Sequence, residues 1–284
     1  MILFNRQTKL RVFTDSQSID IEDLNVGFSI SAHRRRTPNK GQFQVYNLAE
    51  DTAHLIEQEA QYLEFFAGYS SAPLGRIHKG FVDTSTTLLM GTERITTISS
   101  VDSGETKQYT LASITETFGE GTPVKDVFSK FASVLNMPVT LDYVGTDVLL
   151  SSETYMGPLR NALDELASDY GYDWSIQFGV LEVVKKGEAP NKDSQALILT
   201  KENIIDIPEV TNRGLKLKTL ILPGLIPSRL LTVPGNIQST TGRKVKKSLK
   251  ERGIGGTYIT DSIDYTGERD GKKYEAVIDA WRQL

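Results

Sequence analysis

Short runs of alternating apolar and polar residues dominate the first hundred residues of the chain. LRVFT, VGFSISAH and QFQVYNL alternate in this way, and turn-forming clusters such as TPNKG separate them. A two-residue period places every second side chain on the same face of a strand, so these runs predict an antiparallel sheet of barrel or sandwich type. One helical pattern interrupts the strands at residues 49–62, where Leu55, Ile56 and Ala60 are spaced for one helix face.

The middle of the chain repeats a pattern of one helix followed by one strand. TPVKDVFSKFASVLNMPVTLD, from Thr122, aligns without a gap with GPLRNALDELASDYGYDWSIQ, from Gly157. A proline opens each helical segment, where its missing N–H is tolerated, and Thr122 is the expected cap of the first helix. Asn136 and Gly171 stand where a helix end favours a left-handed residue. The repeat predicts two α/β modules in tandem, which are too few for a solenoid.

Strand-like sequence returns after a polar stretch at residues 185–195. ALILT, GLKLKTLIL and LPGLIPSRLLTVPG precede a terminal hairpin made of TYITDSIDYT and YEAVIDAW around GERDGKK. The predicted order is sheet, two helix-strand modules, sheet, which is an α+β, mostly β fold. We place the first sheet domain at 1–112, the modules at 113–190, and the second sheet domain at 191–284 with a long basic loop at 238–256.

Composition narrows the function classes. Of the 284 residues 39% are hydrophobic, enough to fill a core, and none is cysteine, which excludes disulfides, thiolate nucleophiles and zinc-thiolate sites. The net charge of −4 is too mild for a dedicated nucleic-acid binder. MILFNRQTKLRVF lacks the apolar core of a signal peptide, and no run approaches the roughly 18 apolar residues of a membrane-spanning helix, so we expect a soluble protein.

No catalytic or metal-binding motif stands out. His33, His54 and His78 are too scattered for a metal site, and GIGGTY leads into a predicted strand instead of the helix that a phosphate site needs. The prediction is therefore no catalytic residue, no metal and no cofactor.

Carboxylates are numerous enough to supply an acid and base pair for glycoside cleavage. Those in the second repeat share a helix with Leu159, Leu163 and Leu166, so a solvated polar face is the favoured interpretation. The candidates are Glu116, Glu120, Asp164, Glu165 and Asp169.

Two basic clusters stand out against the mild net charge. GRKVKKSLKERG carries one of them, which we interpret first as a solvated loop and alternatively as a partner-binding loop that orders against an acidic surface. Its cations are Arg243, Lys244, Lys246, Lys247, Lys250 and Arg252. The other cluster, residues 34–36 (Arg34, Arg35 and Arg36), is expected to be a solvated hairpin turn. Aromatic residues do not interleave with either cluster, which argues against binding of single-stranded nucleic acid.

An ordered set of segments runs through nearly the whole chain. It comprises FQVYNLAEDTAHLI, YLEFFAGYSSAPLGRIHKGFVDT, ERITTISSVDSG, both repeats, and GLKLKTLILPGLIPSRLLTV. In this order the segments resemble the baseplate hub and tail hub proteins of tailed phages, a family that also resembles the hub part of type VI secretion spike proteins. The turn Asp102-Ser103-Gly104 replaces the Asp-Gly-like turn of the family pattern.

The resemblance implies two tube-type antiparallel β-barrel domains separated by the insertion of helix-strand modules. It implies a homotrimer whose six such domains form a ring joining a sixfold tail tube to a threefold spike. The implied partners are the tail tube protein, the central spike protein and other baseplate proteins, with the tape-measure protein as a further candidate and DNA only in transit through the channel. The implied location is the tail baseplate of a virion assembled in the host cytoplasm, without a membrane anchor, and no catalytic residue carries over.

Two alternative functions remain open. One is a tail-tip cell-wall hydrolase in which Glu165 or Asp169 acts as a catalytic carboxylate. The other is a receptor- or glycan-binding module, which would need exposed aromatics such as Tyr170, Tyr172 and Trp174.

Overall fold

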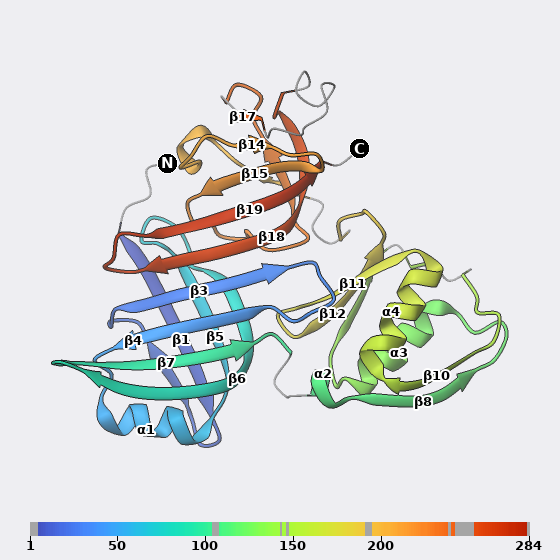
Figure 1. The fold of residues 1–284 in the computed structure, drawn as a ribbon, viewed down its shortest axis with the longest axis horizontal. Coiled ribbons are helices and arrows are strands. Elements are labelled where there is room, and N and C mark those ends of the chain that lie inside the picture. Colours follow the sequence, from blue (N-terminus) through green and yellow to red (C-terminus); the bar gives the residue numbers. More distant parts are fainter. Residues whose placement is uncertain are drawn as a thin grey trace.

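The computed structural model describes residues 5–103, 108–142, 144–145, 148–190, 195–237, 240–241 and 253–282. A large sheet forms one body, and a smaller α/β lobe built from the two repeats lies beside it (Figure 1). The prediction of an α+β, mostly β fold is confirmed. No helix in the described part of the chain is long and apolar enough to cross a membrane.

The large sheet draws its strands from both ends of the chain. In order along the path they run β17-β14-β15-β19-β18-β3-β4-β7-β6-β5-β1-β2, with β13 and β16 attached beside β18. The N-terminal strands are β1 (Arg6–Thr14), β2 (Ser18–Ile21), β3 (Val26–His33), β4 (Lys40–Tyr46), β5 (Ala60–Tyr69), β6 (Gly75–Met90) and β7 (Glu93–Val101). The C-terminal strands are β13 (Leu197–Ile198), β14 (Glu209–Val210), β15 (Gly214–Thr219), β16 (Leu230–Val233), β17 (Thr240–Thr241), β18 (Gly256–Glu268) and β19 (Tyr274–Arg282).

Pairing between β18 and β3 joins the two sheet segments. The strands run antiparallel from Ser262 opposite His33 to Glu268 opposite Gly27. One hydrophobic core follows from this pairing, because buried residues of both segments belong to a single cluster. The Tyr274 hydroxyl ties the segments further, donating to the Gln7 carbonyl at 2.6 Å and accepting from the N–H of Gly68 at 2.9 Å. The division into two tube-type barrel domains stays a prediction.

Helix α1 (Glu50–Glu59) follows β4 within the stretch predicted to be helical, but Ala60, which was placed on the helix face, begins β5. Ala53 and Ile56 are buried against the sheet, and Glu50 and Asp51 lie in the first turn, where carboxylates favour the helix dipole. The helix contacts β6, β1 and β5, so it covers one side of the N-terminal strands.

The α/β lobe confirms the tandem modules. The first repeat forms α3 (Val124–Val134) and β9 (Val139–Asp142), and the second forms α4 (Leu159–Tyr170) and β11 (Tyr172–Gln177). The repeat strands do not touch each other, because both pair with β12 (Val180–Lys185), β9 in parallel and β11 antiparallel. The remaining elements are α2 (Gln108–Leu111), β8 (Ser113–Phe118), β10 (Glu153–Pro158) and, beyond the lobe, the 3-10 helix η2 (Lys201–Asn203).

Local signals were correct at the C-terminal ends of α3 and α4, whereas the prolines expected in the first helical turns, Pro123 and Pro158, are the N-cap residues. Asn136 (φ 54°) and Gly171 (φ 74°) adopt the left-handed conformation expected after each helix. The prediction that Thr122 caps α3 is wrong. Pro123 is the N-cap, and the Thr122 hydroxyl donates instead to the Gly119 carbonyl at 2.8 Å.

Candidate assembly surfaces

Three turns meet in a polar junction between the large sheet and the α/β lobe. Asp102, directly after β7, is 1% exposed. Its carboxylate accepts hydrogen bonds from the backbone N–H groups of Phe178 at 2.7 Å and Gly179 at 2.8 Å, in the β11–β12 turn. Both turn residues have positive φ, and successive N–H groups of such a turn form a concavity suited to an anion. The lobe therefore places a hairpin turn on a carboxylate that the sheet supplies.

Asn39, in the turn between β3 and β4, organises the rest of this junction. Its Nδ2 donates to Asp102 at 3.3 Å and to the Gln177 Oε1 at 3.0 Å, while its Oδ1 accepts from the N–H of His33 at 2.8 Å. Gln177 Nε2 donates to the His33 carbonyl at 2.8 Å. Burial raises the pKa of Asp102 to about 7, although hydrogen bonds from Phe178, Gly179 and Asn39 act in the opposite direction. The network is complete only when the two bodies are docked.

The basic turn at residues 34–36 also belongs to this contact. Arg34 is 8% exposed, its Nη2 donates to the Glu188 carbonyl at 2.8 Å, and its guanidinium lies 5.8 Å from the centre of the Trp281 ring. Burial lowers the pKa of Arg34. Arg36 pairs with Asp164 of α4 at 3.2 Å. The prediction of a fully solvated turn is therefore wrong, because two of the three arginines bind the lobe or its linker.

The candidate carboxylates lie in separate structural settings. Glu165 and Asp169 are exposed on α4, which confirms the solvated face. Asp164 accepts a hydrogen bond from Trp174 Nε1 at 3.0 Å in addition to its pairing with the basic turn. Glu116 lies 3.4 Å from Lys130, and Glu120 is exposed. These contacts do not bring the carboxylates together as an acid and base pair.

The histidines and the aromatic residues of the second repeat do not form a site. His78 is buried, lies 3.0 Å from the Ser100 hydroxyl, and has a pKa lowered to about 3 by burial. His54 is exposed beside Glu57, and across the described ranges no three His, Asp or Glu side chains gather as a metal site would require. The glycan-binding alternative requires exposed aromatics such as Tyr170, Tyr172 and Trp174, but Tyr172 and Trp174 are buried and Tyr170 is half-buried.

The basic loop residues Arg243, Lys244, Lys246, Lys247, Lys250 and Arg252 lie outside the described residues. Their role in partner binding stays a prediction.

Surface chemistry differs between the two ends of the large sheet. At the β2 end, Asp20 lies 2.7 Å from Lys9 and 2.6 Å from Arg11, and this pairing holds the pKa of Asp20 well below its usual range. Such charges protect a sheet edge from adventitious pairing.

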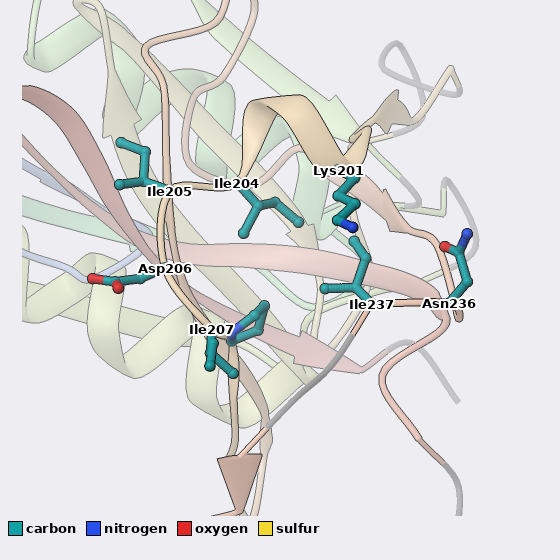
Figure 2. Close-up of a pocket in the computed structure, with 8 residues that line it drawn as sticks. Lys201, Ile204, Ile205, Asp206, Ile207, Asn236 and Ile237 are labelled. Carbon is teal, nitrogen blue, oxygen red and sulfur yellow. The ribbon is translucent and has the colours of Figure 1, made fainter.

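At the β14 end, a pocket of about 460 Å³ opens between residues 201–208 and Ile237. Lys201, Ile204 and Ile237 converge there (Figure 2).

The hairpin between β6 and β7 exposes three consecutive apolar side chains. Leu88 is 65% exposed, Leu89 is 73% exposed and Met90 is 63% exposed. Sequence reasoning missed this tip, although three apolar residues in a row before a Gly-Thr turn break the alternation of the strand and could have indicated it.

Several solved structures share this architecture. The 43 kDa tail protein of prophage MuSo2 from Shewanella oneidensis superposes with a TM-score of 0.63 at 12% identity, covering 97% of this chain and 98% of that chain. A tail protein of Neisseria meningitidis gives a TM-score of 0.61 at 11% identity, covering 98% and 97%.

The chain has the fold of phage tail proteins. A component of the E. coli type VI secretion system, described as similar to the phage T4 tail proteins gp27 and gp5, shares this fold with a TM-score of 0.57 at 11% identity, covering 92% of this chain and 73% of that chain. The resemblance read from the sequence is thus confirmed at the level of the phage-tail fold. No protein-family model matches the sequence, and neither does any curated protein.

Proposed function

We propose that this chain is a structural hub subunit of a phage tail or a tail-like injection machine, in which three copies form a ring between the tail tube and the central spike. The observation that carries the proposal is the end-to-end match with a tail protein of similar extent, over 97% of this chain and 98% of the other. A match of this coverage includes both sheet segments and the lobe, as the ordered segments in the sequence also do.

The polar side chains described above connect parts of the chain to one another, which suits a mechanical role. Asp102, Asn39 and Gln177 hold the lobe against the sheet. Asp164 pairs with Arg36 and accepts a hydrogen bond from Trp174. The buried polar side chains of these surfaces thus serve the contact between two parts of one rigid frame, and we propose that the chain is not an enzyme. Its partners would be the tube, the spike and neighbouring baseplate proteins, which would bind its strand edges and loops.

Light scattering and negative-stain electron microscopy on the same purified fraction test the proposal. The expected result is a particle of three times the 31.5 kDa chain mass with a central hole. A chain that stays a compact monomer, alone and when mixed with tail tube and spike proteins, would overturn the proposal. Hydrolysis of purified peptidoglycan that is lost in Glu165→Ala would favour the hydrolase instead.

A further inference from the structure

The lobe and the large sheet have separate hydrophobic cores (Figure 1). Every buried residue of the lobe cluster lies between Tyr109 and Val183, and the sheet cluster contains no residue from that range. Among the described strands, none of the lobe pairs with a strand of the large sheet. The two bodies therefore meet through turns and side chains instead of through a shared core or a shared ladder of backbone hydrogen bonds.

The β11–β12 hairpin has one face toward the lobe core and the other toward the large sheet. Tyr172 and Ile176 of β11 lie in the lobe core, and the side chains between them alternate to the opposite face. This opposite face carries Asp173, Ser175 and Gln177 of β11 and Glu182 and Val184 of β12. Ser175 and Gln177 are buried, at 4% exposure each, and Gln177 joins the polar junction. The lobe thus presents a mostly polar face to the sheet.

Arg34 lies in this contact with its charge incompletely compensated. Among the described residues its Nη1 is buried without a hydrogen-bond partner, while Nη2 donates to the Glu188 carbonyl. Asp173 and Glu182 of the hairpin act on the guanidinium electrostatically. A buried charged donor without a partner raises the free energy of the closed arrangement, and water would satisfy that donor if the two bodies parted.

Both connections between the two bodies adjoin the junction. The chain leaves the sheet after β7, where Asp102 lies, and it leaves the lobe after β12, where Glu188 binds Arg34. Separation at this contact would break polar interactions that water can replace and would leave both hydrophobic cores intact. An opening of this kind costs less free energy than the unfolding of a core.

We propose that the lobe is a hinged unit, which separates from the large sheet at the polar junction and closes again while both bodies stay folded. Asp102 holds the closed state, because the turn of the hairpin donates two backbone hydrogen bonds to its carboxylate. The hinge would let the lobe change its orientation during assembly without disturbing the sheet. It does not depend on the number of copies in the ring.

Thiol labelling of a Ser175→Cys variant measures the opening, because the native chain contains no cysteine. The full-length variant is treated with an excess of an aromatic disulfide reagent under native conditions. Ala167→Cys in the lobe core and Ala276→Cys in the sheet core are the controls, since both alanines are fully buried. The thiol at position 175 should react at least about tenfold faster than either control, equivalent to about 1.4 kcal/mol.

A second substitution tests the role of Asp102. Adding Asp102→Ala to Ser175→Cys should raise the labelling rate by at least about a further tenfold, because the closed state loses its acceptor. Adding Asp169→Ala, which removes an exposed carboxylate on α4, is the matched control and should leave the rate unchanged. Equal rates in these two double variants would refute the role given to Asp102.

Two further outcomes would refute the hinge itself. Equal rates at positions 175 and 167 would mean that the junction opens only when the lobe unfolds. Reaction at position 175 as fast as that of a free thiol would mean that the junction is not closed in solution. Amide hydrogen exchange checks the same point in the unsubstituted chain, where the N–H groups of Phe178 and Gly179 should exchange at least about tenfold faster than that of Leu163 in α4. Equal exchange of these groups would also refute the hinge.

Discussion

Replacing Asp102 with alanine removes the acceptor at the centre of the junction between the lobe and the large sheet. Two donors, the N–H groups of Phe178 and Gly179, lose their partner inside the protein, and the amide of Asn39 loses one acceptor while keeping Gln177. An unsatisfied buried donor costs about 1–3 kcal/mol. We therefore expect Asp102→Ala to lower the free energy of unfolding by about 2–6 kcal/mol.

Urea denaturation followed by tryptophan fluorescence measures this loss. The two tryptophans report on different bodies, since Trp174 lies in the lobe core and Trp281 on β19 of the large sheet. In Asp102→Ala the unfolding transition reported by Trp174 fluorescence, measured in a Trp281→Phe background, should have its midpoint at a lower urea concentration. Asp169→Ala, which removes an exposed carboxylate on α4, is the matched control and should stay within about 0.5 kcal/mol of the native chain. A loss below about 1 kcal/mol in Asp102→Ala would refute the reasoning that this network holds the lobe.

Four further predictions follow from the same contacts. Burial raises the pKa of Asp102 from 3.8 to about 7, so the folded chain keeps a proton that the unfolded chain releases. Its contribution to stability is fully present below about pH 4 and is lost as the pH rises through about 7. Asp102→Asn cannot titrate, and its stability relative to the native chain should rise across this window in urea titrations; a constant difference would contradict the assignment. Gly214→Ala should destabilise by about 1–3 kcal/mol or more, because a Cβ there would lie 2.1 Å from the Ala280 carbonyl oxygen, whereas Gly119→Ala, with open space around it, should be neutral in the same thermal melts. Tyr274→Phe should cost about 1–3 kcal/mol in urea denaturation because it leaves the buried N–H of Gly68 without an acceptor, and an unchanged midpoint would argue against that hydrogen bond. Neutralising four cations of the basic loop should leave the melting temperature unchanged but weaken ring assembly at physiological salt, measured by light scattering, and equal assembly of both proteins would exclude that role. The four cations are Arg243, Lys244, Lys246 and Lys247.

Local patterns in the sequence determined the secondary structure and the general fold class. Two-residue alternation predicted the strands, the repeat predicted α3 and α4 with their following strands, and the left-handed positions at Asn136 and Gly171 were correct. These features depend on backbone preferences and on which face of one element is apolar, and both are written in a few neighbouring residues. The order of such segments was also sufficient to indicate the phage-tail fold.

Contacts between distant segments could only come from the tertiary structure. Nothing in the neighbourhood of β18 indicates that it pairs with β3, and the repeat does not indicate that both of its strands flank β12. Arg34 and Asp102 are buried although ionisable side chains are usually exposed. Each hydrogen-bonds to backbone groups far along the chain, which local sequence does not reveal. Pairing and burial of this kind depend on the free energy of the whole packed arrangement, which local periodicity does not contain. The sequence alone thus determined the secondary-structure elements and the family resemblance. The tertiary structure decided that both ends of the chain contribute strands to one sheet, which contacts hold the lobe against that sheet, and which apolar side chains stay exposed to solvent.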